Sequence, residues 1–434
     1  MNYSPAKTLI LFFLGLIITG VLLLSLPAAR SSGDFSFITS LFTSVSAVCV
    51  TGLSVVNIGE YYSTFGQIVI LILVQLGGIG YMFVSTFITL LFGKIALKDR
   101  RIMQDIFDIS SFSGLKKLLL KAVFFVLVIE FTGAVVLTFI FFRSFSFLRS
   151  VYLGIFYSIA AFCNAGFGFF CDSLAGFAND PALLYVISVL VLIGGLGFFV
   201  IVDIYDTYKE KRLRLWTHTK VVLSISAVIT FFAFILFLFS GALRGHGLFY
   251  SINNAFFQAV SARTAGFYSV PVNLFSEFTD AILLFLMSAG AAPGSTAGGV
   301  KVTTLALVFI FVRSVLKGDD DFVLFKRRIP AGIVKKALAV FIIFFASIAF
   351  FSAIIVLLES CLKPLTVVFE VVSAFATAGL SLGITADLSV EGKVLIIIAM
   401  IAGRIGILTL LILVLDPVGK KKRIRYPEAR ILVG

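Results

Sequence analysis

The stretch that decides the fold is FFQAVSARTAGF, residues 256–267, which is mostly apolar and ends in Thr264-Ala265-Gly266-Phe267. A helix needs about 20 residues to cross a bilayer, so this stretch is too short to span one and has the length of a re-entrant segment. Three further stretches share its pattern, and they read FTSVSAVCVTGL, FYSIAAFCNAGF and FEVVSAFATAGL, with glycines at Gly52, Gly166 and Gly379.

The four stretches agree at fixed distances from the glycine. Each has a phenylalanine well before the glycine, a small residue midway and a bulky apolar residue directly after it. The phenylalanines are Phe42, Phe156, Phe256 and Phe369, the small residues are Ala47, Ala161, Ser261 and Ala374, and the bulky residues are Leu53, Phe167, Phe267 and Leu380. Four copies of one element indicate an internal repeat, and a repeat decides the architecture.

The composition is that of a polytopic membrane protein. Of the 434 residues, 60% are hydrophobic, 50 are Phe and only 13% are charged. A soluble domain is ordinarily about a quarter charged. The chain has two histidines, and its four cysteines (Cys49, Cys163, Cys171 and Cys361) lack zinc-like spacing, which argues against a His/Cys metal centre.

The net charge of +13 is concentrated in particular segments. Lysines and arginines gather in 94–121, 209–220, 313–336 and 420–430, at intervals of two long apolar segments. By the positive-inside rule these segments are cytoplasmic, and so are both termini. We therefore expect the basic tail to set orientation and contact anionic lipid, and we expect no nucleic-acid binding.

The predicted fold is an all-α polytopic membrane protein with four repeated helix–pore half-helix–loop–helix units around a central pore. The units are 1–95, 96–210, 211–330 and 331–416, followed by a cytoplasmic tail, 417–434. Residues 8–28 resemble a signal peptide, but the repeat indicates a retained outer helix, with its counterparts at 118–142, 220–240 and 335–358. The half-helices are 36–49, opened by Ser36 as an N-cap, 151–163, 250–263 and 365–376. The second helices are 66–92, 183–206, an interrupted 279–314 and 392–415.

The four glycine loops have the composition of a cation filter. An ion that crosses a bilayer loses its water, and backbone carbonyls on a constrained loop can replace it. Glycine permits the required backbone, and each half-helix directs the negative end of its dipole at the loop. The loops contain no acidic residue, which excludes a carboxylate ring. The alternative is that the loops are simple turns. The predicted filter residues, which bind the ion through their carbonyls, are Val50, Thr51, Gly52, Asn164, Ala165, Gly166, Thr264, Ala265, Gly266, Thr377, Ala378 and Gly379.

A glycine-rich mark also recurs in the second helices. It reads GGIG at 77–80, GGLG at 194–197, AAPG at 291–294 and GRIG at 403–406. Helix packing through small residues explains most of the first two copies. The third and fourth copies need a further explanation.

Two segments of the third unit resemble signature sequences of the Trk/Ktr/HKT superfamily of potassium transporters, SARTAGF (261–267) and PGSTAGGVK (293–301). The resemblance extends over essentially the whole chain, and the ending PEARILVG (427–434) looks most like the bacterial Ktr membrane subunit. It implies potassium uptake across the bacterial plasma membrane through a filter at the four glycines. Gly52, where some relatives have serine, implies a preference for potassium over sodium. Only the second loop has a glycine two residues after the key glycine, Gly168. The loops as a set therefore follow a looser pattern than the strict T-x-G-[YF]-G.

The resemblance also implies partners. The Ktr membrane subunit is a homodimer on a cytoplasmic ring of nucleotide-binding regulatory subunits. This chain has no Walker motif, so nucleotide is expected on the partner. No covalently bound cofactor is expected, and K⁺ is the transported ion. The segments 94–121 and 313–336 are candidate docking surfaces, although orientation alone also explains their charge.

The third unit is interrupted by a segment that cannot form a regular helix. It combines one proline with three glycines, and a break at membrane depth is expected to line a cavity. The resemblance makes this segment a mobile intramembrane gate, while the alternative is a static kink. The predicted gate residues are Ala292, Pro293, Gly294, Ser295, Thr296, Ala297, Gly298, Gly299 and Lys301.

Two arginines fall inside the predicted membrane region, where charges are expensive and indicate function. Arg404 replaces the second glycine of the fourth mark, so it is either a pore barrier to cations or a structural bridge to Glu370 or Glu130. Arg263 lies in the third loop, where we expect it to brace the loop from behind.

Other functions fit the sequence less well. An intramembrane enzyme would need a nucleophile, a base or a metal set, and the chain lacks HExxH, GxSxG and paired aspartates. An inverted-repeat transporter would alternate the orientation of its repeats, whereas these run in one sense. A scaffold would not need glycine-ended half-helices. Within transport, a less selective Na⁺/K⁺ pathway without a regulatory ring is the alternative, and coupling to sodium or protons stays open.

Overall fold

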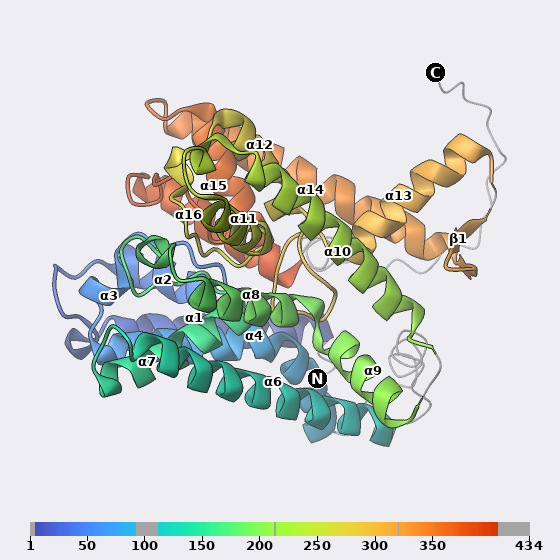
Figure 1. The fold of residues 1–434 in the computed structure, drawn as a ribbon, viewed down its shortest axis with the longest axis horizontal. Helices are drawn as coiled ribbons and strands as arrows, with labels where there is room; N and C mark the ends of the chain where they lie inside the picture. Colours follow the sequence, from blue (N-terminus) through green and yellow to red (C-terminus); the bar gives the residue numbers. More distant parts are fainter. Residues whose placement is uncertain (1–4, 93–111, 212–213, 320, 407–434) are drawn as a thin grey trace.

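The computed structural model describes residues 5–92, 112–211, 214–319 and 321–406. The predicted tail 417–434, the last part of the predicted helix 392–415 and most of the basic segment 94–121 lie outside the described residues. Within them, the predicted all-helical repeat architecture is confirmed (Figure 1).

Each unit contains an outer helix, a short half-helix and a second helix. Unit one contains α1 (Pro5–Leu24), η1 (Pro27–Ala29), α2 (Phe37–Val48), α3 (Ile58–Tyr61) and α4 (Thr64–Phe92). Unit two contains α6 (Phe112–Phe141), α7 (Phe147–Phe162), η2 (Ala175–Phe177), α8 (Pro181–Leu196) and α9 (Phe198–Lys209). Unit three contains α10 (Thr217–Leu238), η3 (Gly241–Leu243), α11 (Leu248–Ser261), η4 (Val272–Leu274), α12 (Glu277–Ser288) and α13 (Val302–Lys317). Unit four contains α14 (Ala331–Leu358), α15 (Pro364–Ala376) and α16 (Val390–Ile405).

The half-helices α2, α7, α11 and α15 are too short to cross a bilayer. With 12 residues, α2 is about 18 Å long, against a hydrocarbon core of about 30 Å. Ser36 caps α2 as predicted, because its hydroxyl accepts a hydrogen bond from the Thr39 N–H at 3.4 Å. Pro364 occupies the first turn of α15, where its missing N–H has no helical partner to lose.

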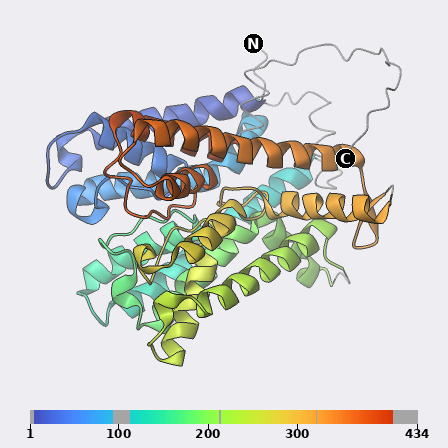
Figure 2. The ribbon, with the colours of Figure 1, turned by 90° about the horizontal axis from the view of Figure 1, so that it is seen from above.

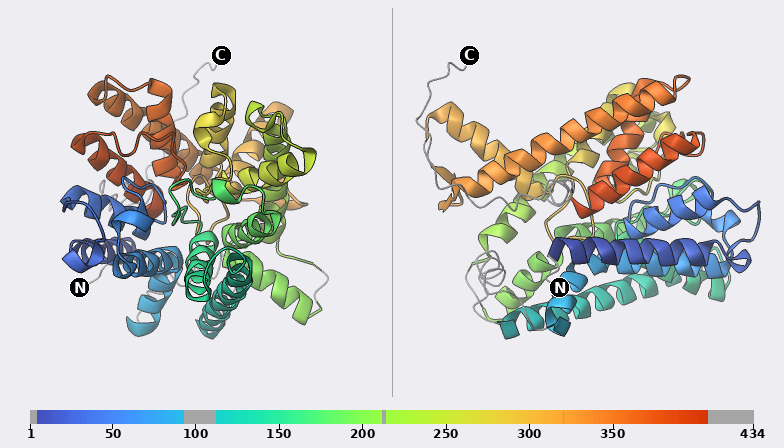
Figure 3. Two further views of the ribbon diagram at one scale, coloured as in Figure 1. Left: turned by 60° about the vertical axis from the view of Figure 1, so that its left-hand side comes forward. Right: turned by 180° about the vertical axis from the view of Figure 1, so that it is seen from behind.

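The four units form a closed ring. The second helix of each unit packs on the half-helix of the next, through the pairs α4–α7, α8–α11, α12–α15 and α16–α2. The left view of Figure 3 shows the units arranged around their central loops, and Figure 2 shows the long helices running roughly parallel. This cyclic packing brings together loops that are far apart in the sequence.

Three described helical segments are long and apolar enough to cross a membrane, namely Leu120–Phe141, Thr217–Leu238 and Ala331–Leu358. The pair α8 and α9 adds a fourth crossing if the two are taken as one span. Side chains such as Phe131, Phe231 and Phe350 are exposed on these segments, as expected for a surface in contact with lipid. The chain is a multi-pass membrane protein.

The predicted continuous helix 183–206 is wrong. It breaks at Gly197, and α8 and α9 meet there at 92°. Gly197 has φ +79°, and a Cβ on it would lie 3.0 Å from the carbonyl oxygen of Pro293. The helix bends here because the backbone of the third unit occupies the space that a side chain would need.

The predicted interruption of the third unit is confirmed, since α12 ends at Ser288 and α13 begins at Val302. Beyond α13, the sequence did not predict a short antiparallel hairpin of β1 (Phe322–Leu324) and β2 (Arg327–Ile329).

Candidate functional site

The four loop glycines meet in a ring. A Cβ added to any of them would meet the carbonyl oxygen of the residue before the next glycine around the ring. For Gly166 this atom is the oxygen of Ala265 at 3.0 Å, and for Gly266 it is the oxygen of Ala378 at 2.7 Å. Gly379 faces Thr51 and Gly52 faces Ala165 in the same way, so the ring is closed.

The backbone of the four loops is also alike. The glycines have φ values of +91°, +63°, +79° and +80° at Gly52, Gly166, Gly266 and Gly379. The residue two positions before each glycine is left-handed as well, at Val50, Asn164, Thr264 and Thr377. Residues with a Cβ rarely adopt this conformation, so its fourfold recurrence marks a specific loop structure that simple turns would not require.

The carbonyl groups of the loops lack internal partners. The N–H groups of Thr51, Ala165 and Ala378 each turn back at 2.8 Å to the half-helix, on the oxygens of Ser46, Ala160 and Ser373. Among the described residues, no carbonyl oxygen of the three predicted filter positions in any loop accepts a hydrogen bond. Backbone carbonyls ordinarily pair with the chain or with water, so these oxygens are free to contact water or an ion.

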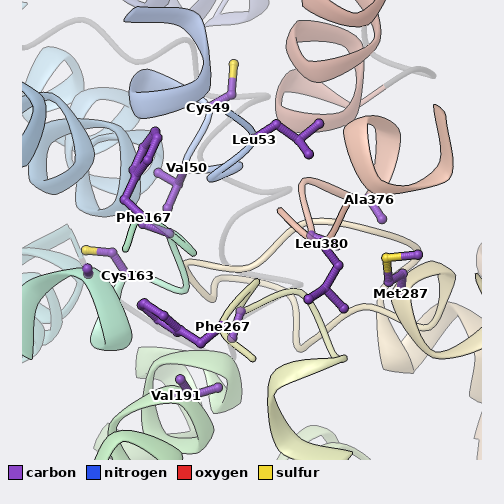
Figure 4. Close-up of a cluster of buried hydrophobic side chains, with 14 of the residues drawn as sticks. Cys49, Val50, Leu53, Cys163, Phe167, Val191, Phe267, Met287, Ala376 and Leu380 are labelled. Atoms are coloured by element: carbon purple, nitrogen blue, oxygen red, sulfur yellow. The ribbon is translucent and has the colours of Figure 1, made fainter. Parts of the chain in front are cut away.

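Polar side chains add to this unpaired set. The hydroxyl oxygens of Thr51, Thr264 and Thr377 and the amide oxygen of Asn164 are buried and have no hydrogen-bond partner in the described part of the chain. The residues after the glycines pack around the loops from all four units, as Figure 4 shows for Leu53, Phe167, Phe267 and Leu380. These four side chains are almost fully buried. The site is thus rich in oxygen, contains no carboxylate and has an apolar surround.

The predicted gate lies against two of the loops. Its base is closed by a hydrogen bond of 3.1 Å from the N–H of Val300 to the oxygen of Ser288. The amide of Asn164, in the second loop, donates to the hydroxyl of Thr296 at 3.0 Å, and that hydroxyl donates to the oxygen of Phe162 at 3.0 Å. A Cβ on Gly298 would meet the hydroxyl of Thr377 in the fourth loop.

Further hydrogen bonds hold the same segment. The N–H of Ala292 donates to the oxygen of Gly195 at 3.0 Å, and the ammonium of Lys301 donates to the oxygen of Ala297 at 2.6 Å. The predicted gate residues 292–299 and Lys301 therefore form one compact loop, which α8 holds from the side.

Arg404 contacts backbone carbonyls of two other units. Its guanidinium donates to the oxygen of Thr296 in the gate and, at 2.6 Å, to the oxygen of Gly77 on α4. Of the two carboxylates proposed from the sequence as its partners, Glu370 accepts from the hydroxyl of Thr385 and Glu130 accepts from the amide of Gln75 at 2.7 Å. Arg404 thus bridges units through carbonyls.

Arg263 braces the third loop from behind, as predicted. Its guanidinium donates to the hydroxyl of Thr230 at 3.0 Å and to the oxygen of Ser226 at 3.3 Å, both on α10. It also donates to the oxygen of Gly290 at 3.3 Å, at the start of the interrupted segment.

The glycine-rich marks are packing surfaces. A Cβ on Gly77 would lie 3.0 Å from the Cα of Val48, and one on Gly403 would lie 3.0 Å from the Cα of Phe375. Gly194 meets Phe162 in the same manner. In each case the second helix contacts the last turn of the half-helix in its own unit, so the first glycine of the fourth mark also serves packing.

Sequence reasoning missed three features of the site. It did not find the link between Asn164 and Thr296, the bend at Gly197 or the buried pair of Glu130 and Gln75. Glu130 was visible as an acidic residue in an apolar run, but its partner lies on another unit and has no sequence signal.

Comparison with known proteins gives concordant results. The family model TrkH, described as a cation transport protein, matches residues 7–422. The chain is 36% identical to the potassium/sodium uptake protein NtpJ of Enterococcus hirae, over 99% of this chain and 97% of that protein. It is also 36% identical to the Ktr system potassium uptake protein B of Vibrio alginolyticus, over 99% and 94% of the two chains. The crystal structure of the potassium transporter TrkH from Vibrio parahaemolyticus shares the fold, with a TM-score of 0.74 and 19% identity over 95% of this chain and 85% of that one.

Proposed function

The chain belongs to the TrkH family of cation transport proteins, and from this premise we propose that it takes up potassium through a filter formed by its four glycine loops. One observation carries the proposal. The loops meet in a closed ring of buried carbonyl oxygens that have no hydrogen-bond partner among the described residues. A dehydrated cation would supply the missing partner for these oxygens.

The ring suits a monovalent cation that must also leave. Uncharged oxygen ligands bind K⁺ without the strong attraction of a carboxylate, and the four half-helices direct negative dipole ends at the ring. Relatives named for potassium uptake, at 34–36% identity over nearly the full length, support the choice of ion.

The segment 291–301 is the gate in this proposal. It touches the loops at Asn164 and Thr377 and is held by Arg404, whose charge also opposes a passing cation. Uptake then requires these hydrogen bonds to break and the segment to move aside. If the segment is instead a static kink, substitutions that remove these hydrogen bonds will leave the uptake rate unchanged.

The remaining parts of the proposal concern assembly. The relatives named as Ktr system proteins support a system with a further, regulatory component. We propose that this chain forms a homodimer, that the further component is a cytoplasmic nucleotide-binding subunit, and that both termini of this chain lie on that side. A second candidate is a less selective Na⁺/K⁺ pathway that acts without such a subunit. The relative named as a potassium/sodium uptake protein favours it.

The experiment is rubidium uptake and growth rescue in a bacterium without potassium import, in potassium-rich and in sodium-rich media, with and without a regulatory subunit. Gly266→Ser is compared with Gly176→Ser. Gly266 has φ +79° and no room for a Cβ, whereas a Cβ on Gly176 would meet nothing within 4 Å.

We expect wild type and Gly176→Ser to take up rubidium and to restore growth, and Gly266→Ser to lose potassium preference. Equal uptake by all three, at equal membrane levels, would mean that the loops are packing turns. Growth inhibition by sodium in wild type would favour the less selective pathway.

A further inference from the structure

Hydrogen bonds and packing connect α9 to its neighbours α10 and α6. Asp203, on α9, is fully buried and accepts hydrogen bonds from the N–H of Trp216 at 3.0 Å and from the hydroxyl of Thr219 at 2.6 Å. On its other side, α9 packs against α6, where Phe125 and Tyr205 are in edge contact. Figure 1 shows α9 between the ends of α6 and α10.

A groove of about 870 Å³ lies between α9 and α10. Three lining residues are aliphatic, Ile204 from α9, Leu215 from the segment before α10 and Leu223 from α10. The others are Thr207, Tyr208, Lys209 and Lys211. The lining therefore combines aliphatic and cationic side chains.

The sequence around the groove is basic. Residues 209–220 contain five lysines and arginines and one acidic residue, Glu210. Of the two aspartates on α9, Asp206 pairs with Lys121 at 2.7 Å and Asp203 accepts from Trp216 and Thr219. Thr207 lines the groove, and its hydroxyl oxygen has no hydrogen-bond partner in the described residues.

The groove lies at the boundary of the apolar region. The candidate spans Thr217–Leu238 and Leu120–Phe141 both begin beside it, at α10 and at the Lys121 contact. Tyr208, which is 85% exposed, and Trp216 are the amphipathic aromatic types that settle where hydrocarbon meets water. A ligand here would place an apolar part in the membrane and a charged part outside it.

We infer that this groove binds an anionic glycerophospholipid. Lys209, Lys211 and Thr207 would hold the headgroup phosphate, and one acyl chain would lie along Ile204, Leu215 and Leu223. Basic pockets at the membrane surface between helices are suited to anionic headgroups, and the aliphatic part of the lining distinguishes a lipid from a free phosphate ion.

The test measures lipid bound to the purified full-length protein by native mass spectrometry during titration with phosphatidylglycerol or phosphatidylcholine. Lys209→Gln/Lys211→Gln removes the two charges, and Leu223→Trp fills the aliphatic part of the lining without changing charge. Lys335→Gln/Lys336→Gln is the matched control, because it removes two exposed charges at the start of the span Ala331–Leu358, away from the groove.

We expect wild type to prefer phosphatidylglycerol, and the Lys209/Lys211 variant to bind it about tenfold more weakly. Leu223→Trp should also weaken binding, and the control should bind like wild type. Thermal unfolding of each variant in detergent shows whether it is folded.

Four results would overturn the inference. The first is equal binding of the two lipids, and the second is an equal loss in the Lys335/Lys336 control. The third is full displacement of the lipid by inorganic phosphate, which would make the groove an ion site. The fourth is unchanged phosphatidylglycerol binding in both groove variants. That result would show that the lipid does not bind in the groove and would favour a protein partner there.

Discussion

Arg404 donates a hydrogen bond to the carbonyl oxygen of Thr296, so the last described helix of unit four holds the interrupted segment of unit three. The same guanidinium reaches Gly77 of unit one at 2.6 Å. One side chain thus connects three of the four units beneath the loops. Both of these acceptors are backbone carbonyls of other units.

Substitution of Arg404 separates its two roles. We expect Arg404→Gln to raise rubidium uptake several-fold, because the variant loses both the cationic barrier and the anchor on Thr296. Arg404→Lys keeps the charge but loses the forked donor geometry. If Arg404→Lys takes up rubidium like wild type, the positive charge limits uptake. If it takes up rubidium like Arg404→Gln, the hydrogen bond to Thr296 limits uptake. Arg313→Gln is the control for charge, since Arg313 is exposed on α13. Wild-type uptake by Arg404→Gln would contradict both roles.

The packing of Gly403 on the half-helix α15 predicts a loss of stability on substitution. In an exposed helix, Gly→Ala is stabilising by up to about 1 kcal/mol. In Gly403→Ala the new methyl would overlap the backbone carbonyl oxygen of Phe375, and overpacking costs about 1–3 kcal/mol. We expect a lower melting temperature in detergent for Gly403→Ala and none of this loss for Gly15→Ala, where a Cβ would meet nothing within 4 Å. Equal melting temperatures would mean that the contact relaxes freely.

The position of Arg263 behind the third loop predicts that its removal reduces transport. Arg263→Met keeps the length of the side chain but leaves Thr230 and the oxygens of Ser226 and Gly290 without their donor. We expect lower uptake and weaker preference for rubidium over sodium, with a smaller effect in Thr230→Val. If Arg263 faced the ions, Arg263→Met would raise uptake instead, so the sign of the change decides.

The repeat made most of this architecture predictable. Four glycines at matched offsets placed the half-helices and loops, since spacing along the chain is retained in the fold. The bend at Gly197 was not predictable, because GGLG fits helix packing equally well and only the approach of Pro293 from another unit prevents a straight helix. The partners of Arg404 were missed for a related reason. A sequence displays carboxylates such as Glu370, whereas the carbonyls of Thr296 and Gly77 become available only when helices end or pack.

Glu370 also has a partner that the sequence did not indicate. It accepts from the hydroxyl of Thr385, which follows the fourth loop, and this hydrogen bond holds the fourth loop to the half-helix α15. Equivalent braces occur in two other units, where the hydroxyl of Tyr157 accepts from the N–H of Phe169 at 3.1 Å and the amide of Gln258 donates to the oxygen of Val270 at 2.9 Å. Glu370 is the acidic member of this set and is 1% exposed.

This brace predicts different results for two substitutions of Glu370. Glu370→Gln keeps an oxygen that accepts from Thr385, and the neutral Gln258, which donates to Val270, shows that a brace at this place needs no charge. We therefore expect near-normal uptake and selectivity. Glu370→Ala removes the carboxylate acceptor of Thr385 and leaves it only the hydroxyl of Ser381, at 3.0 Å in the next part of the same loop. The loss costs about 1–3 kcal/mol and frees the fourth loop from its half-helix. We expect this variant to lose stability and to discriminate rubidium from sodium less well. Thr366→Ala, at a half-buried position in the first turn of the same half-helix, controls for disturbance of α15. Loss of selectivity in Glu370→Gln equal to that in Glu370→Ala would show that the carboxyl group itself, and not the hydrogen bond to Thr385, sets the geometry of the loop.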